Sequence, residues 1–247
     1  MDIRIAFPTD EHHPYQDDKA IALALKIVNE FDPTEIVVGS DGMDFYSISK
    51  FSKDPDRMKG GSLQDEIDSW VRTQRMWIDA APNARRHYIP GNHEDRLKKY
   101  IWEHPELHGL DALQLPSLLE FDQLALSEIE DEVEFGDKLL VTHGSVVRKY
   151  GAYTAKGELE NQFYSISTMT GHTHRGGMTM ATGRKGMVQG IECFCLCDLE
   201  PDYVKSPNWQ QGVVLATVSD FGVHFEPVPF FRANGKIFAQ WRGQEYS

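Results

Sequence analysis

The chain has 247 residues and a formal charge of −13 at pH 7, with 40% hydrophobic and 26% charged residues. This composition supplies enough apolar side chains for a core and excludes a disordered or collagen-like chain. The length fits one large domain or two small ones. The excess of acidic residues repels polyanions, so sequence-independent binding to nucleic acid would need a local basic patch or metal ions.

Neither a membrane anchor nor a secretion signal is expected from the sequence. The longest apolar run, 20–28, is interrupted by a lysine and is far shorter than the roughly 20 apolar residues that cross a bilayer. The N-terminal segment becomes polar by Thr9 and lacks the apolar core of a signal peptide. We therefore expect a cytoplasmic protein with no membrane partner. Cys193, Cys195 and Cys197 are too close together in a strand to pair with one another, so no disulfide framework is expected.

The N-terminal part alternates strand and helix patterns. Residues 3–7 alternate apolar and polar side chains and stop at a proline, as a strand does that ends in a loop. Residues 18–31 carry apolar side chains around most of a helix surface, which predicts a helix buried between layers. Residues 35–39 form a short β-branched run and predict a second strand. Strand, helix and strand in this order indicate an α/β domain.

The middle of the chain contains the clearest helix signal. Ser62 and Asp65 form a capping box for a helix that we expect from Leu63 to about Ala80, because its apolar residues recur at helical spacing. Further expected elements are a strand at 86–89, a helix at 94–104, and strands at 138–144, 165–170, 192–199, 212–218 and 223–228.

The run 120–137 contains eight acidic residues and is interpreted as a solvated edge rather than as a store for cations. The chain shows no internal repeat, low-complexity tract or flexible linker. We therefore expect a single domain over residues 1–247, with insertions near 46–81 and 95–136.

Side chains that can bind metals follow five of the predicted strands. The C-terminal ends of strands are where α/β sheets place their ligands. The residues are Asp10 and His12, Asp41 and Asp44, Asn92 and His93, His143, and finally His172 and His174. Imidazole, carboxylate and amide donors together suit borderline divalent ions such as Mn, Fe, Zn or Ni. Two cations about 3.5 to 4 Å apart need a bridging ligand, and Asp41 is the natural bridge because a carboxylate can bridge whereas a neutral imidazole cannot.

The order of the motifs, DxH, GDxxD, GNHE, a lone histidine and GHxH, resembles that of the calcineurin-like metallophosphoesterases, a family of phosphatases, phosphodiesterases and nucleases. The resemblance extends from Asp10 to His174 and to the strand order across most of the chain. It implies a four-layer α/β/β/α fold, a β-sandwich of mixed sheets flanked by helices. It also implies a phosphate ester substrate, a mono- or diester, hydrolysed by a hydroxide that bridges two divalent metal ions, of which manganese is the first expectation.

Matched residue by residue, the resemblance implies two metal sites that share one carboxylate. The first would be formed by Asp10, His12, Asp41 and His174, and the second by Asp41, Asn92, His143 and His172. His93 then corresponds to the general acid of the family. Asp44 corresponds to the carboxylate that orients this histidine.

Three positions qualify the match. Ser40 stands where most members of the family have glycine directly before the bridging aspartate. Glu11 and His13 form a second acid-x-His pair, but the preferred pair lies closer to the strand. Pro14 and the stretch 44–51 resemble stand-alone members of the family from phages and prophages.

Three arginines are candidate substrate contacts, and two other functions are compatible with the motifs. Arg96, Arg148 and Arg175 lie within five residues of predicted ligands, where a phosphate contact and a surface salt bridge are equally consistent with each. A metal-dependent DNA or RNA nuclease would take nucleic acid as its substrate and needs a cationic groove. Candidates for lining that groove are Arg85, Arg86, Arg96, Lys98 and Lys99. A non-catalytic scaffold with the same fold is disfavoured because every implied ligand is present.

Overall fold

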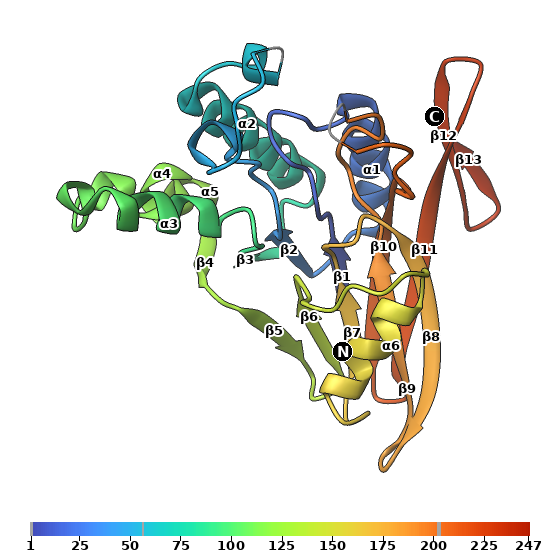
Figure 1. The fold of residues 1–247 in the computed structure, drawn as a ribbon. Helices are drawn as coiled ribbons and strands as arrows, with labels where there is room; N and C mark the ends of the chain where they lie inside the picture. The colour runs from blue at the N-terminus through green and yellow to red at the C-terminus, as the bar shows by residue number, and fades with distance from the viewer. Residues whose placement is uncertain (1, 56, 202–203) are drawn as a thin grey trace.

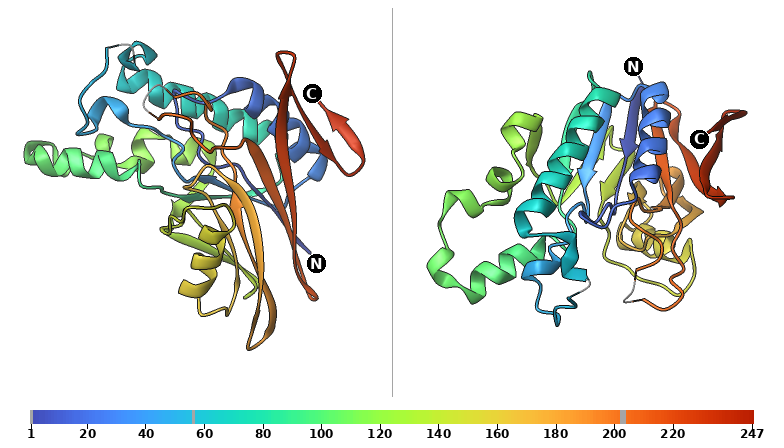
Figure 2. Two further views of the ribbon diagram at one scale, coloured as in Figure 1. Left: turned by 45° about the vertical axis from the view of Figure 1, so that its right-hand side comes forward. Right: turned by 90° about the horizontal axis from the view of Figure 1, so that it is seen from above.

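The computed structural model describes residues 2–55, 57–201 and 204–247. Over these residues the chain forms two mixed β-sheets that pack face to face, with helices on both outer faces (Figure 1, Figure 2). The predicted α/β/β/α layer order is therefore confirmed. Among the helices described, none combines the length and apolar character needed to cross a bilayer.

The first sheet contains the strands that precede the first three motifs. Its strands are β1 (Ile3–Phe7), β2 (Glu35–Gly39), β3 (Arg85–Ile89), β4 (Leu126–Ile129), β10 (Gly212–Ser219), β11 (Gly222–Ala233), β12 (Lys236–Trp241) and β13 (Gln244–Tyr246). In the described part of the chain their order is β13-β12-β11-β10-β1-β2-β3-β4. Strands β1 to β4 run parallel, so their C-terminal ends share one edge of the sheet.

The second sheet contains the strands that precede the last two motifs. Its strands are β5 (Glu132–Phe135), β6 (Leu139–Thr142), β7 (Ser167–Thr170), β8 (Gly176–Gly183) and β9 (Gly186–Cys193). Their order is β5-β6-β7-β9-β8, and β6, β7 and β9 run parallel. The strand ends before His143 and His172 therefore lie next to one another.

The helices cover both sheets. They are α1 (Asp18–Phe31), α2 (Leu63–Ala80), α3 (Asp95–Glu103), α4 (Leu115–Leu118), α5 (Phe121–Leu124) and α6 (Tyr153–Asn161). Helices α1 and α2 lie side by side over the first sheet, α6 covers the second, and α3 to α5 project to one side of the body (Figure 2). The predicted helices at 18–31 and from Leu63 to Ala80 are confirmed, together with the Ser62–Asp65 capping box.

The alternation of side chains in β1 creates two cores. Ile5 and Phe7 face the second sheet, whereas Ala6 faces the helices. On the helix side, the fully buried Trp70 packs edge-on against Tyr88 of β3, so this tryptophan belongs to the core.

Two stretches differ from a simple strand pattern. The predicted strand at 192–199 is wrong beyond Cys193, where β9 ends. Phe194 takes a φ of 65°, and the chain continues through isolated bridges that include Cys195 with Gln211. The acidic run includes β4 and β5, which are edge strands of their sheets. Glu132 and Glu134 point to solvent from β5, as expected of a solvated edge.

Candidate metal centre

Strained backbone marks the places where the predicted ligands leave their strands. Asp10, His12, Asp41, His172 and His174 have φ values between 52° and 74°. Residues other than glycine rarely adopt this left-handed region, and each such residue costs of order 1 to 3 kcal/mol. Strain of this kind persists where the surrounding structure enforces it.

Two motif glycines let the strand-end loops approach closely. A Cβ atom on Gly91 would lie 2.1 Å from Asp41 Oδ1, and one on Gly171 would lie 2.6 Å from Asp10 Oδ2. Either side chain would displace a carboxylate from its place. The glycines of GNHE and GHTH are therefore required by the packing of the loops themselves.

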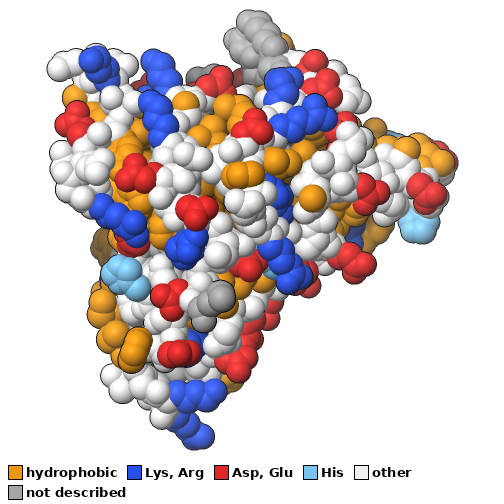
Figure 3. Space-filling view, turned by 180° about the vertical axis from the view of Figure 1, so that it is seen from behind, with side chains coloured by type: hydrophobic (Ala, Val, Ile, Leu, Met, Phe, Trp, Pro, Cys, Tyr) orange, Lys and Arg blue, Asp and Glu red, His pale blue; other side chains and the backbone are white. Residues whose placement is uncertain are grey.

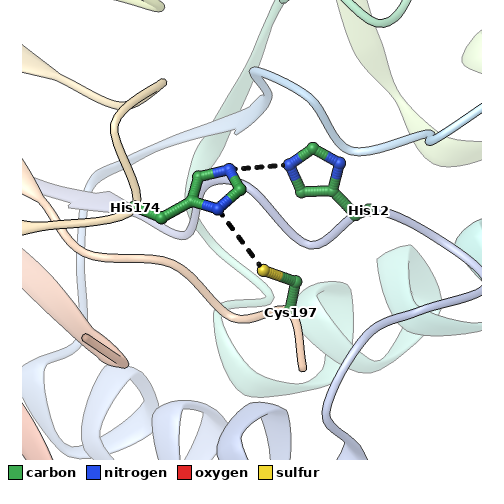
Figure 4. A group of neighbouring side chains, drawn as sticks. All are labelled: His12, His174 and Cys197. Atoms are coloured by element: carbon green, nitrogen blue, oxygen red, sulfur yellow. Dashed lines mark hydrogen bonds between the residues drawn. The ribbon is translucent and has the colours of Figure 1, made fainter. Parts of the chain in front are cut away.

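One donor group forms around Asp10. His12 Nε2 lies 2.9 Å from His174 Nε2, which lies 3.2 Å from Asp10 Oδ1. Asp41 Oδ2 lies 4.0 Å from His12 Nε2. Figure 4 shows the rings of His12 and His174 pointing toward one another from loops far apart in the sequence. All four side chains are buried.

A second donor group forms around His143. Its Nε2 lies 2.9 Å from His172 Nδ1, 3.1 Å from Asn92 Oδ1 and 3.5 Å from Asp41 Oδ2. Asn92 and His172 come from the ends of different sheets, so the second group spans the sandwich. The structure thus brings together all seven side chains that the sequence predicts as ligands.

Asp41 links the two groups. Among the described residues, Asp41 is shared by two sets of donors whose atoms lie within 4.8 Å of one another, one with Asp10 and His12 and the other with His143 and His172. Asp41 Oδ2 faces both sets, while Oδ1 accepts the backbone N–H of His93 at 2.8 Å. Carboxylates, imidazoles and an amide oxygen in this arrangement fit a pair of borderline divalent cations.

Asp44 organises the ring of His93. The Asp44 carboxylate lies 3.4 Å from His93 Nδ1 and 3.4 Å from His12 Nδ1, and it also receives hydrogen bonds from Arg57 and Arg96. Burial alone would raise the pKa of Asp44, but hydrogen bonds from the two histidines lower it well below its usual range. Asp44 is therefore ionised near neutral pH.

The two histidines at Asp44 respond in opposite directions. Burial, with the charge of His93, lowers the pKa of His12 to about 3, so this ring is neutral at pH 7, as a metal ligand must be. Burial opposes the charged form of His93, but the charge of Asp41 and the hydrogen bond to Asp44 outweigh it and raise the pKa of His93.

The structure distinguishes the two acid-x-His pairs at the first strand end. His13 is fully buried and points away from the centre, where its ring contacts Ser69 Oγ at 2.9 Å and Glu11 at 3.1 Å. Glu11 also accepts a hydrogen bond from Trp77 Nε1 at 2.8 Å. This pair fixes the loop against α2, whereas His12 turns toward His174.

Ser40 and Glu94 have positions that the sequence analysis did not assign. Ser40 Oγ lies 2.8 Å from His143 Nδ1 and accepts a hydrogen bond from Thr9, so the serine that departs from the family pattern orients a predicted ligand. Glu94 accepts backbone N–H groups from Gly91 at 2.7 Å and Met43 at 3.1 Å. In the sequence, Ser40 is noticeable only as a departure from the family pattern, and Glu94 only as the last residue of GNHE. Neither feature shows which groups these side chains contact.

Cys197 contacts the candidate centre from outside. Its Sγ lies 3.8 Å from His174 Nδ1, on the side of the ring opposite His12 (Figure 4). Burial raises the pKa of the Cys197 thiol well above its usual value, so the sulfur is a neutral thiol at pH 7. A His174 ring that uses Nε2 as a ligand carries its proton on Nδ1, where this sulfur is the acceptor.

The three candidate arginines occupy different surroundings. Arg96 lies beside His93, with Nη2 3.0 Å from His93 Nε2. Arg148 is exposed on the loop after β6. Arg175 is buried, and its guanidinium donates to the carbonyls of Arg148 and Lys149 and pairs with Glu192 at 3.4 Å. Arg175 thus holds this loop in place.

The cations suggested for a nuclease groove do not form one continuous surface. Arg85 and Arg86 begin β3, at the end of the strand opposite the centre, and the Arg86 guanidinium donates to the carbonyls of Ala81 and Ala84. Arg96 and Lys99 instead lie on α3, close to the centre.

Two phage proteins are similar to this chain over nearly its whole length. The Gene 54 protein of Mycobacterium phage L5 is 26% identical over 268 residues, covering 96% of this chain and 99% of the phage protein. The Gene 54 protein of Mycobacterium phage D29 is 26% identical over 260 residues, with the same coverage of 96% and 99%. No protein-family model matches the chain.

Two solved structures are similar at low identity. A double mutant of Vps29 from Entamoeba histolytica has a TM-score of 0.48 and 12% identity, covering 96% of this chain and 97% of that one. Vacuolar Protein Sorting 29 from Cryptosporidium parvum has a TM-score of 0.48 and 12% identity, covering 100% of this chain and 98% of that one.

Proposed function

We propose that this protein is a calcineurin-like metallophosphoesterase that hydrolyses phosphate mono- or diesters with two divalent metal ions. Manganese is the metal that we expect. One observation carries the proposal: Asp41 Oδ2 faces both donor groups, 4.0 Å from His12 Nε2 and 3.5 Å from His143 Nε2. A single carboxylate between two sets of nitrogen and oxygen donors is what a two-metal site needs. The order of the five motifs gives independent support.

The proposed ligands divide as the resemblance implies. One ion would be held by Asp10, His12, Asp41 and His174, and the other by Asp41, Asn92, His143 and His172. When bound, such a pair activates water near neutral pH and neutralises charge on the phosphoryl oxygens.

His93 is the proposed donor of a proton to the leaving oxygen. Its Nδ1 lies 3.2 Å from the carbonyl oxygen of Asp44 and 3.4 Å from the carboxylate, so a proton on Nδ1 is shared with Asp44. This contact fixes the ring with Nε2 toward the centre, 3.9 Å from Asp41 Oδ2. A histidine held by a carboxylate can protonate an alkoxide at neutral pH.

Arg96 is the proposed phosphate contact. Its Nη2 lies 3.0 Å from His93 Nε2, and because arginine can only donate, this contact and a proton on Nε2 exclude one another. A substrate phosphate forms the stronger, charge-assisted bond with a guanidinium and would draw Arg96 away from the ring. Substrate binding would then free Nε2 to carry the proton.

The test combines turnover with metal counting. We expect the manganese-loaded protein to hydrolyse bis(p-nitrophenyl) phosphate or p-nitrophenyl phosphate. We expect His93→Ala to retain both metals and to lose roughly two to four decades of turnover on diesters with alkyl leaving groups. His224→Ala, a change at an exposed histidine of β11, is the control. If the manganese-loaded protein hydrolyses none of these esters, the proposed function is refuted. If His93→Ala turns over its substrates as fast as the unaltered chain, His93 is not the general acid.

A further inference from the structure

Among the described residues, an acidic cavity and a basic cavity border the candidate centre. This acidic cavity has a volume of about 400 Å³ and reaches His143. Its lining includes Asp95, Asp131, Glu132 and Glu158. Carboxylates in this number repel a second negative group of a substrate.

The second cavity is basic and aromatic. This basic cavity has a volume of about 260 Å³ and is lined by Lys50, Arg96 and Lys99, with Phe51 and Tyr100 beside them. Glu103 also belongs to its lining. The Phe51 side chain is 62% exposed, so its ring is accessible to a ligand, and the Arg96 guanidinium lies 5.7 Å from the centre of that ring.

The basic cavity lies on the side of the proposed general acid. It shares Arg96 with His93, and it also contacts Asn92, a proposed metal ligand. A group that leaves from phosphorus toward His93 would therefore leave next to Arg96 and Asn92, which line this cavity. Ligand pockets for whole small molecules measure about 300 to 1,000 Å³, so a cavity of this size suits a single nucleotide unit rather than a longer ligand.

The overall negative charge of the chain means that an anionic ligand must be attracted by a local group of cations. Acidic and basic side chains are interspersed over the face drawn in Figure 3, and the chain as a whole carries −13. An anionic ligand is therefore attracted where cations gather, as Lys50 and Lys99 do here, rather than by the general surface. An aromatic ring beside cations is the combination that binds a base and its phosphate.

We propose that the basic cavity binds a nucleotide on the leaving-group side of a phosphodiester, with its base on Phe51 and a further phosphate at Lys50 and Lys99. The inference depends on the proposed function and names its substrate class. In the reaction, water gives up one proton to the solvent, its oxygen bonds to phosphorus, and the P–O bond to the nucleotide breaks. The leaving oxygen keeps the electron pair and takes the proton from His93.

The binding step is tested without catalysis. In EDTA, the full chain is titrated with a short dinucleotide that carries 2-aminopurine and a terminal phosphate, and fluorescence reports stacking of the base. Base stacking on an aromatic side chain is lost with the ring, so we expect Phe51→Ala to weaken binding about 10-fold and Phe51→Trp to restore it. Lys99→Ala should weaken binding of the phosphorylated dinucleotide more than binding of its dephosphorylated form.

Matched controls separate this inference from the proposed function. Phe221→Ala removes a fully exposed ring from the turn between β10 and β11 and should bind as the unaltered chain does. Equal binding by Phe51→Ala, or no binding by the unaltered chain, overturns the nucleotide assignment even if bis(p-nitrophenyl) phosphate is hydrolysed. A single-stranded 20-mer that binds far more tightly than the dinucleotide overturns it in favour of a polymer groove.

Discussion

Glu94 joins the two loops that carry Asp41, the proposed bridging carboxylate, and His93, the proposed general acid. It is 4% exposed and accepts the backbone N–H groups of Gly91 at 2.7 Å, Met43 at 3.1 Å and Asp41 at 3.3 Å. Gly91 belongs to the loop after β3, whereas Met43 and Asp41 belong to the loop after β2. Glu94→Ala therefore removes the acceptor that ties one loop to the other.

The size of the loss follows from these contacts. A buried donor left without a partner costs about 1 to 3 kcal/mol. The N–H groups of Met43 and Asp41 at Glu94 are buried, whereas that of Gly91 is partly buried. We therefore expect Glu94→Ala to lower the free energy of unfolding by about 2 to 6 kcal/mol, a large part of the 5 to 15 kcal/mol typical of a domain. Glu94→Gln keeps one acceptor oxygen and should lose less.

Urea unfolding followed by circular dichroism measures the change, and metal content measures its effect on the centre. The control is Asp95→Ala at the next position, which removes an exposed ion pair with Lys99 at 3.7 Å. Such a pair contributes about 0 to 1 kcal/mol. If Glu94→Ala lowers the free energy of unfolding no more than Asp95→Ala does, Glu94 does not hold the loops after β2 and β3 together.

Three further predictions concern charge and the outer contacts of the centre. Asp41→Asn should reduce metal occupancy at both sites together, and plasma emission spectrometry that finds two ions per chain would disprove the bridge. Burial raises the pKa of Glu66 from 4.5 to about 7, so ionisation of this carboxyl costs the fold stability as pH rises from 4.5 to 7. At 1.36 kcal/mol per pKa unit this cost reaches up to about 3 kcal/mol, and Glu66→Gln should remove it, so the melting temperature of the variant should fall less steeply over that range than that of the unaltered chain. Cys197→Ala should weaken metal affinity about 10- to 100-fold by freeing His174 Nδ1, measured by calorimetric titration, whereas Cys193→Ala, an equally buried change, should not.

Sequence patterns identified the elements whose own residues determine them. Helix α1 lies between layers, and its apolar positions reveal this directly; α2 begins at a capping box that is visible in the sequence. The sequence did not predict helix α6. Its buried face includes the polar residues Thr154 and Glu158, so apolar residues do not recur clearly at helical spacing. Glu158 is buried because it accepts the backbone N–H groups of Ser145 and Val146, a tertiary role that periodicity does not report.

The same distinction applies to the site. Residue type and motif order suffice to select the side chains that converge, because parallel strands bring their C-terminal ends together. The residues that orient these side chains could not be predicted in the same way. Ser40, Glu94 and Arg57 act across loops that are separated in the sequence, so their partners are visible only once the strands are aligned.

The distribution of buried charge explains why Asp41 is central. Asp10 is compensated by His174, and Asp44 by His12, His93 and two arginines, so the pKa of each is lowered despite burial. For Asp41 the balance is reversed, because burial outweighs the attraction of His93 and raises its pKa. A buried carboxylate of this kind costs stability until cations neutralise it. Binding of divalent ions should therefore stabilise the fold through Asp41 above all, which ties the strained loops to the metals that they would hold.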